Sequence, residues 1–317
     1  MCTAVNFTSL HNYFGRNLDL EKSYGERVVI TPRHYKFSFG TLPSAESQYA
    51  LIGMAVVADN YPLYYEATNE KGLSMAGLSF PDNAYYGAYQ KDKDNVAPFE
   101  MIPYILTKCK DTAEARKLLS NINIVDISFS DKLPLSPLHW IISDRDLSIT
   151  LESTKEGLKI YDNPYGVLTN NPTFDYHLIN INNYMSLSEN YPENRLSDKH
   201  SYNAYSLGMG ALGLPGDFSS ASRFIRAVFI KEKSPSFESE NEAVSHFFHI
   251  LGSVAMPKGC VMTRSGECEY TRYSSCCNTD EGVYYYRLYD SSNITAVHMH
   301  KSDLDSEELI EYELGDG

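Results

Sequence analysis

Apolar side chains alternate with polar ones along many short stretches of this chain, and these stretches are rich in β-branched and aromatic residues. Such alternation is typical of β-strands. The stretches are Cys2–Phe7, Arg27–Thr31, Tyr49–Val57, Tyr64–Thr68, Leu73–Phe80, Leu138–Ser143, Ser148–Ser153, Tyr270–Cys276, Gly282–Tyr289 and Ile294–Met299. The turn sequences Asn69-Glu70-Lys71-Gly72 and Asp144-Arg145-Asp146 each separate two of them and predict hairpins.

Four longer stretches place apolar residues three and four positions apart, which is typical of amphipathic helices. These stretches are Phe99–Lys108, Ala113–Ile122, Ser219–Lys233 and Glu242–Met256. Short polar side chains stand where N-caps are expected. Asp111 and Thr112 precede the second helix, and Asp217 or Ser219 precedes the third.

The order of these elements indicates the architecture. Strands are followed by two helices, more strands, two more helices and a last group of strands, which predicts an α+β fold with layered αββα packing. Because strands and helices do not alternate one by one, a doubly wound parallel sheet is not expected. No linker-like tract interrupts the chain, so residues 1–317 are expected to form a single domain. We interpret its acidic tail, Asp303–Asp316, as a solvated terminus.

The composition limits the possible partners. Hydrophobic residues make up 43% and charged residues 21% of the 317 positions, as in a folded globular protein. Lys and Arg number 27 against 41 Asp and Glu, a net charge of −14, which argues against nucleic acid or an anionic membrane surface as the partner. A small anionic ligand remains possible, because a local arginine pocket can oppose the overall field. The 25 tyrosines against one tryptophan suggest half-wet positions at clefts or subunit interfaces.

Neither a membrane-spanning segment nor a targeting segment is expected. No run of about 18 apolar residues occurs, and the first residues lack the basic and apolar regions of a signal peptide. We therefore predict a cytoplasmic protein with reduced thiols. Five cysteines are interpreted as small buried hydrophobic residues, namely Cys109, Cys260, Cys268, Cys276 and Cys277.

Two patterns resemble ligand-binding motifs but lack the surroundings that those motifs need. Residues 208–213 match G-x-G-x-x-G, yet no apolar strand precedes them and a Pro-Gly pair follows where a helix is required. These glycines instead predict a tight loop or a close approach of another backbone. The pairs His246/His249 and His298/His300 have ligand-like spacing but no third ligand in a recognisable motif. We expect neither a metal nor an organic cofactor.

Cys2 is the residue from which chemistry is expected. Removal of Met1 is plausible because its neighbour is small, and the mature chain would then begin with a cysteine. A free α-amine has an ordinary pKa of about 7.7–8.0, so it can act as the general base for the thiol and later as an acid. The thiolate is a strong nucleophile.

Arg16 and Asp19 lie three residues apart beyond the first strand. If the second strand runs antiparallel to the first, it returns both side chains towards Cys2. Arg16 would then favour the thiolate electrostatically, and Asp19 would hold the α-ammonium or accept its proton. The alternative is an ordinary exposed ion pair between residues i and i+3.

A set of short motifs is distinctive as a group. The motifs are Cys2-Thr3-Ala4, Phe14-Gly15-Arg16-Asn17-Leu18-Asp19, Thr31-Pro32-Arg33, Asn69-Glu70-Lys71-Gly72-Leu73, Leu138-His139-Trp140, Leu168-Thr169-Asn170-Asn171-Pro172-Thr173-Phe174-Asp175, Gly213-Leu214-Pro215-Gly216-Asp217 and Ala221-Ser222-Arg223-Phe224. In these motifs and in their order the chain resembles the choloylglycine hydrolase family, and the resemblance runs from Cys2 to at least Asp305. The resemblance is strongest to bacterial bile salt hydrolases, with penicillin V acylases as cousins.

The resemblance implies an N-terminal-nucleophile hydrolase with a four-layer αββα fold, usually a homotetramer. It implies a small amphipathic anionic substrate, a bile acid joined by an amide bond to glycine or taurine. Cys2 corresponds to the nucleophile, and Arg16 and Asp19 to the residues that position and tune it. Asn170 corresponds to an oxyanion-stabilising residue and Arg223 to a second active-site arginine. These roles suit attack on an amide carbonyl, because the developing oxyanion needs preorganised donors.

Two positions depart from the pattern of the bile salt hydrolases. Ser79 stands where those enzymes carry an oxyanion-binding asparagine, and we expect its shorter hydroxyl to donate directly or through a water. Ser206 and Leu207 stand in the loop that selects glycine or taurine conjugates, where glycine-preferring members often have Ser-Arg. The missing arginine leaves the preferred conjugate open.

A steroid needs an apolar cleft with few polar groups. Candidate lining residues are Leu18, Tyr24, the segment Ala58–Tyr65, and the segment Phe129–Leu135 including Leu133. Each of them is equally well explained as a core or interface residue. Three functions follow: a bile salt hydrolase with possible acyl transfer to other amines, an acylase of penicillin V or other N-acyl amides, and a catalytically weak or silent binding homologue that keeps the pocket.

Overall fold

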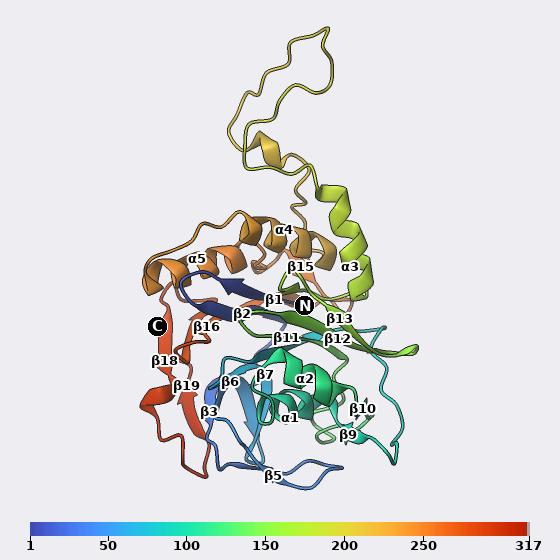
Figure 1. Cartoon of the computed structure of the whole chain (residues 1–317), viewed down its shortest axis with the longest axis vertical. Coiled ribbons are helices and arrows are strands. Elements are labelled where there is room, and N and C mark those ends of the chain that lie inside the picture. The colour runs from blue at the N-terminus through green and yellow to red at the C-terminus, as the bar shows by residue number, and fades with distance from the viewer. Residues whose placement is uncertain (316–317) are drawn as a thin grey trace.

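The structure, a computed structural model, describes residues 1–315 and has two antiparallel sheets stacked between two layers of helices (Figure 1). The first sheet has the order β14-β1-β2-β16-β17-β18, with β15 paired to β16. Its strands are β1 (Cys2–Thr8), β2 (Asn12–Leu20), β14 (Val167–Leu168), β15 (Val261–Met262), β16 (Cys268–Asn278), β17 (Val283–Leu288) and β18 (Thr295–His298).

The second sheet has the order β13-β12-β11-β8-β7-β6-β3-β19. Its strands are β3 (Arg27–Thr31), β6 (Leu51–Ala58), β7 (Tyr61–Asn69), β8 (Ser74–Ser79), β11 (Leu138–Ser143), β12 (Ser148–Thr154), β13 (Gly157–Asp162) and β19 (Ile310–Glu313). Two short pairs lie outside the main sheets, β4 (Lys36–Phe37) with β5 (Ala45–Glu46) and β9 (Asp94–Val96) with β10 (Ile122–Ile124).

Helices cover the outer face of each sheet (Figure 1). The first sheet is covered by α4 (Ser220–Glu232) and α5 (Glu240–Gly252), and the second by α1 (Met101–Leu106) and α2 (Thr112–Leu119). The remaining helical elements are α3 (Phe174–Asn180) and the 3₁₀ turns η1 (Pro98–Glu100), η2 (Ile181–Tyr184), η3 (Met209–Ala211) and η4 (Met299–Lys301). The predicted αββα layering is confirmed.

The second sheet is buried on both faces, which explains the nearly continuous apolar runs in its strands. In β3, Val28 and Ile30 pack between the sheets, while Val29 packs towards α1. In β11, Ile141 and Ile142 divide in the same way. The molecule therefore has two hydrophobic cores, one reaching from between the sheets to α4 and α5 and one beneath α1 and α2.

Most predicted elements are present, with ends shifted by a few residues. Ser219 caps α4 by accepting a hydrogen bond from Ser222, and Asp111 caps α2 by accepting one from Glu114. The helix predicted to begin at Glu242 begins earlier, because Ser239 caps it. The sequence also gave no indication of α3 or β13.

The acidic tail does not match its interpretation as a solvated terminus. Within it, β19 pairs antiparallel with β3, and Arg27 forms ion pairs with Glu311 and Glu313. The charge run is therefore an edge strand with exposed carboxylates, which resists further strand pairing. Asp316, the last residue of the predicted tail, lies outside the described residues.

The cysteines also differ from expectation in part. All six thiols are free, and Cys109, Cys276 and Cys277 are buried as predicted. Cys260 is exposed and Cys268 half-buried, because both lie in the hairpin that carries β15 at the edge of the first sheet. Within residues 1–315, no helix combines the length and the apolar character needed to span a bilayer.

Candidate active site

Cys2 begins β1 and faces the second sheet. The strand pairs antiparallel with β2, so Cys2 lies opposite Leu18 and Ala4 lies opposite Arg16. Opposed residues share a face of a sheet and alternate residues share it too, which puts Cys2, Arg16 and Leu18 on one face. Cys2 is only 3% exposed, and the predicted return of the second strand is confirmed.

Arg16 is fully buried and is held by the opposite sheet. Its Nη1 donates to the carbonyl oxygens of Tyr65, at 3.0 Å, and Gly77, at 2.6 Å. Its Nε lies 3.8 Å from Oε2 of Glu66. Nη2 has no hydrogen-bond partner within residues 1–315, and Arg16 lines the cavity that contains Cys2. The exposed i, i+3 ion pair is therefore excluded for Arg16.

Glu66 is a buried carboxylate that the sequence analysis missed. It accepts hydrogen bonds from the hydroxyls of Tyr273, Ser275 and Tyr284 at 2.6–2.9 Å. Burial raises the pKa of Glu66, and the neighbouring Arg16 opposes that rise. The available signal was a carboxylate directly after two tyrosines and before an alanine in the predicted strand Tyr64–Thr68.

Asn170 lies beside Cys2 because β14 pairs with β1 and ends at Leu168, two residues before Asn170. Its Oδ1 accepts a hydrogen bond from the backbone nitrogen of Cys2 at 2.9 Å and from Nη2 of Arg223 at 2.7 Å. Its Nδ2 donates to the carbonyl oxygen of Ser79 at 2.7 Å. The amide group therefore connects β1, β8 and α4, and one Nδ2 hydrogen remains for another acceptor.

Arg223 approaches Cys2 from the helical layer. It lies in the first turns of α4, fully buried, and its Nη1 donates to the carbonyl oxygen of Cys2 at 2.5 Å and to the hydroxyl of Thr3 at 2.6 Å. Burial lowers the pKa of Arg223, while Asp19 and Cys2 oppose that decrease. The second arginine implied by the resemblance is thus within hydrogen-bond distance of the Cys2 backbone.

Asp19 is buried next to the chain terminus. Its Oδ1 accepts from the hydroxyl of Thr271 at 2.6 Å, and its backbone exchanges two hydrogen bonds with Met1. The amine of Met1 forms an ion pair with Glu269. Burial raises the pKa of Asp19, and the positive charges of Arg223 and the terminal amine oppose that rise. An amine in this place is therefore surrounded by carboxylates.

A cavity of about 370 Å³ opens in front of Cys2, Arg16 and Ser79. Its walls are mostly apolar and include six predicted lining residues, Leu18, Tyr24, Tyr65, Phe129, Leu133 and Leu135. Lys132, from the predicted segment Phe129–Leu135, also lines it, and so do Ile102 and Trp140, which were not among the predicted lining residues. The predicted apolar cleft therefore exists, and Cys2 and Arg16 are among its lining residues.

Three other predicted residues lie outside this cavity wall. Ala58 ends β6 opposite Tyr61, beside a tight turn in which Asp59 and Asn60 have φ of 50° and 57°. Ser206 and Leu207 belong to the long loop between η2 and α4, which projects from the body of the molecule (Figure 1). Leu207 is 80% exposed. These positions do not meet Cys2 within one chain.

The glycine-rich motif lies in the same projecting loop. Gly208 and Gly213 have φ of 81° and 98°, and a Cβ on Gly210 would collide with the backbone of Asn190. The motif therefore serves loop geometry, as predicted. Within the described residues, no three His, Cys, Asp or Glu side chains are grouped as metal ligands.

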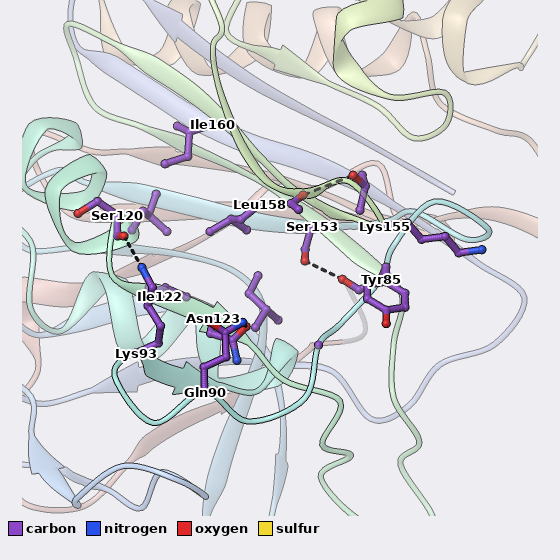
Figure 2. Close-up of a pocket in the computed structure, with 15 residues that line it drawn as sticks. Tyr85, Gln90, Lys93, Ser120, Ile122, Asn123, Ser153, Lys155, Leu158 and Ile160 are labelled. Carbon is purple, nitrogen blue, oxygen red and sulfur yellow. Dashed lines mark hydrogen bonds between the residues drawn. The ribbon is translucent and has the colours of Figure 1, made fainter.

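A second cavity, of about 440 Å³, is lined by residues of the β12–β13 hairpin, β10 and the end of α2 (Figure 2). Tyr85, Lys93 and Lys155 contribute polar groups, and the Nζ of Lys93 donates to the carbonyl oxygen of Ser120. The predicted site residues all lie elsewhere.

The four layers, with a cysteine at the start of an inner strand, define the class of N-terminal-nucleophile hydrolases. The sequence profile of the linear amide C–N hydrolases, choloylglycine hydrolase family, matches residues 2–312, and the chain belongs to this family. It is therefore a hydrolase that acts on linear amide bonds.

Relatives of known name match over nearly the whole chain. A bile salt hydrolase/transferase of Lactiplantibacillus plantarum is 54% identical over 314 residues, which cover 99% of this chain and 97% of the relative. The bile salt hydrolase/transferase of Clostridium perfringens is 39% identical, covering 98% and 96%.

Solved structures agree with the fold. A C2A mutant of conjugated bile acid hydrolase from Clostridium perfringens superposes with a TM-score of 0.92 at 37% identity, covering 99% of this chain and 97% of that one. Penicillin V acylase from Agrobacterium tumefaciens superposes with a TM-score of 0.79 at 22% identity, covering 99% and 92%, which supports the shared fold alone.

Proposed function

We propose that this chain cleaves the amide bond between a bile acid and glycine or taurine, with Cys2 as the nucleophile. The observation that carries the proposal is that Cys2 and Arg16, whose Nη2 has no hydrogen-bond partner among residues 1–315, line one mostly apolar cavity. An amphipathic anion with a rigid apolar body suits such a cavity. The names of the relatives, bile salt hydrolase/transferase and conjugated bile acid hydrolase, point to the same substrates.

The reaction requires removal of Met1, which converts the backbone nitrogen of Cys2 into an α-amine. That nitrogen lies 2.9 Å from Oδ1 of Asn170, which would hold it, and the carboxyl group of Asp19 would balance its charge. The amine accepts the thiol proton as Sγ attacks the carbonyl carbon. The C–N bond then breaks, and the α-ammonium protonates the leaving nitrogen of glycine or taurine.

The acyl group is left on Cys2 as a thioester. The α-amine takes a proton from water as the water oxygen attacks this thioester, the C–S bond breaks, and the proton returns to the thiolate. An amine in place of water would receive the acyl group, which accounts for the word transferase in the names of two relatives. The cycle needs no metal and no organic cofactor.

Two donors are proposed for the oxyanion. Asn170 keeps one Nδ2 hydrogen after its bond to Ser79, and the half-buried Ser79, which carries a hydroxyl, lines the cavity that contains Cys2. Such donors act on charge that develops in the transition state, so they accelerate the chemical step. Asp19, Arg16 and Arg223 position the nucleophile and its neighbours in this proposal.

The proposed assembly is a cytoplasmic homotetramer of single-domain chains spanning residues 1–317. The projecting loop supports assembly, because it exposes large apolar side chains that a partner subunit can cover. They include Met185, Leu196, Tyr205 and Leu207, each at least 80% exposed. Ser206 and Leu207 would then act across a subunit boundary.

Release of glycine or taurine tests the function. Purified protein is incubated with glycocholate, taurocholate and penicillin V in parallel, with Cys2→Ala as the matched control. We expect release of glycine or taurine by the wild type and none by the variant. Hydrolysis of penicillin V alone would assign the chain to the acylases, and no hydrolysis by protein that has lost Met1 would favour the silent binding homologue.

A further inference from the structure

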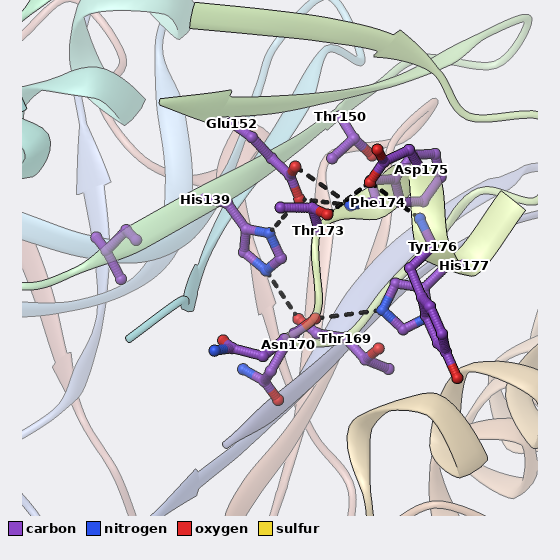
Figure 3. Close-up of polar contacts among 12 residues, drawn as sticks. His139, Thr150, Glu152, Thr169, Asn170, Thr173, Phe174, Asp175, Tyr176 and His177 are labelled. Carbon is purple, nitrogen blue, oxygen red and sulfur yellow. Dashed lines mark hydrogen bonds and ion pairs between the residues drawn. The ribbon is translucent and has the colours of Figure 1, made fainter. Parts of the chain in front are cut away.

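Two buried histidines hold the backbone that carries Asn170 (Figure 3). Nε2 of His139, in β11, lies 3.0 Å from the carbonyl oxygen of Thr169. Nε2 of His177, in α3, lies 3.3 Å from the carbonyl oxygen of Asn170. A carbonyl oxygen only accepts hydrogen bonds, so both Nε2 atoms carry the hydrogen.

Glu152 fixes the other side of the His139 ring. Its Oε1 lies 3.1 Å from Nδ1 of His139, and both of its carboxylate oxygens accept a hydrogen bond from the backbone nitrogen of Phe174, at 3.0 and 3.2 Å (Figure 3). His139 and Glu152 are fully buried. The carboxylate thus orients the imidazole towards Thr169 and ties both to the start of α3.

The same rings contact the neighbours of the proposed site. His139 stacks on Phe80 with ring centroids 4.2 Å apart and planes at 7°, and Phe80 follows Ser79, which accepts the Asn170 amide. His177 packs against Phe224 at 4.7 Å, next to Arg223. His139 therefore contacts the Thr169 carbonyl oxygen and Phe80, next to Ser79, whereas His177 contacts the Asn170 carbonyl oxygen and Phe224, next to Arg223.

The segment between β14 and α3 needs such support. β14 ends at Leu168 and α3 begins at Phe174, so Thr169 and Asn170 lie outside both elements. Their carbonyl groups are oriented by side chains rather than by a regular ladder. Buried polar contacts such as that of His139 with Glu152 are weak evidence for stability, because well-packed apolar residues of similar volume often serve as well. We therefore look for the role of His139 and Glu152 in the orientation of the Thr169–Asn170 backbone rather than in stability.

We propose that His139, oriented by Glu152, is a positioning residue that aligns Asn170 with the nitrogen of Cys2 and with the reacting carbonyl group. This inference rests on the proposed function of Asn170. The side-chain oxygen of Asn170 is 2.9 Å from the Cys2 nitrogen, so a small rotation of the Thr169–Asn170 backbone moves it out of hydrogen-bond range. Displacements of about 1 Å can cost about 100-fold in rate.

The test compares two substitutions of His139. His139→Phe keeps the ring that stacks on Phe80 but removes both nitrogens, and His139→Gln keeps a donor for the Thr169 carbonyl oxygen. We expect His139→Phe to lower kcat by about 10- to 100-fold with KM within about twofold, and His139→Gln to restore most of kcat. Urea unfolding of both variants identifies protein that is folded. If His139→Phe does not fold, Glu152→Gln is measured in its place.

A double-mutant cycle with Asn170→Ala separates positioning from packing. Its readout is the rate at which iodoacetamide alkylates Cys2, which needs no substrate. If His139 acts through Asn170, His139→Phe slows alkylation in the wild-type background and changes it less than about twofold in the Asn170→Ala background. Independent, multiplicative effects, or unchanged kcat and alkylation in folded His139→Phe, would overturn the inference.

The two proposals fail in different ways. If the wild type releases neither glycine nor taurine, the proposed substrate is wrong, while the alkylation cycle still decides the role of His139. If the wild type is active and His139→Phe matches it, only the positioning role is wrong.

Discussion

At the scale of single residues, Arg16 is a buried cation whose carboxylate partner comes from the opposite sheet. The guanidinium is held by two carbonyl oxygens and lies near Glu66, which three hydroxyl groups surround. Burial alone would lower the pKa of Arg16, but Cys2, Tyr273 and Glu66 together raise it above its usual value. The charge is therefore permanent, and its balance depends on Glu66.

Replacing Glu66 is expected to uncover this dependence. Glu66→Ala leaves a buried cation without its partner and should lower the free energy of unfolding by about 3–5 kcal/mol. Glu66→Gln keeps acceptors for the tyrosine hydroxyls and should lose less. Urea unfolding of the two variants measures the difference. Equal stability of Glu66→Ala and wild type would mean that Arg16 does not rely on this carboxylate.

Ser79 is expected to contribute to the chemical step. Ser79→Ala removes a hydroxyl at the cavity edge but keeps the carbonyl group that accepts from Asn170. We predict a decrease of kcat by about 10- to 100-fold with little change of KM, because an oxyanion donor acts in the transition state. Steady-state kinetics with glycocholate decides this, and full turnover by Ser79→Ala would remove Ser79 from the oxyanion set.

Because His177 is buried, the folded protein is expected to lose stability in mild acid. Burial lowers the pKa of His177 to about 4, against an ordinary value of about 6.5. As the pH falls below 6.5, His177 therefore binds a proton in the unfolded chain but not in the folded chain, and the folded state loses stability. From pH 7 to pH 5 this single group removes about 2 kcal/mol. His177→Gln keeps a donor for the Asn170 carbonyl oxygen but does not titrate. Its unfolding free energy should therefore fall less over the same pH range than that of the wild type.

At the scale of elements, the β1–β2 hairpin, which also pairs with β16, contributes Cys2 and Arg16 to the cavity. Cys2, Arg16 and Asp19 lie within one hairpin, so their proximity was predictable from the sequence once antiparallel pairing was assumed. Glu66 and His139 come from the other sheet, and their partners are distant along the chain. Short-range patterns carry no information about such contacts, so the partners of Glu66 and His139 could not be predicted, although Glu66 stands among apolar residues and His139 belongs to a family motif.

Gly15 is expected to be essential to the pairing of β2 with β16. A Cβ at this position would lie 1.9 Å from the carbonyl oxygen of Ser275 in the neighbouring strand, which is a severe clash. Gly15→Ala should therefore cost about 3 kcal/mol or more in unfolding free energy. Gly252→Ala is the matched control, because an added Cβ there meets open space among the described residues. Similar urea midpoints for both variants would show that the strands can separate at no cost.

At the scale of the whole molecule, the apolar patterns and the order of the elements predicted a layered α+β architecture, and the family resemblance implied the four layers that the structure has. The same reasoning failed for the tail, because charge density concealed the alternating Ile310 and Tyr312 of β19. The family resemblance assigned Ser206 and Leu207 to substrate selection, whereas in the structure the loop that carries them leaves the body of the chain (Figure 1). A site shared between subunits would not be recognisable from one chain.

The central claim is that Cys2, with a free α-amine, carries the acyl group. Intact-mass and peptide spectrometry of purified protein, before and after acid quenching of a reaction with glycocholate, tests it most directly. We expect a chain that lacks Met1 and that gains, during turnover, the mass of one choloyl group on its N-terminal peptide. An active protein that retains Met1, or an acyl group found on any residue other than Cys2, would contradict it.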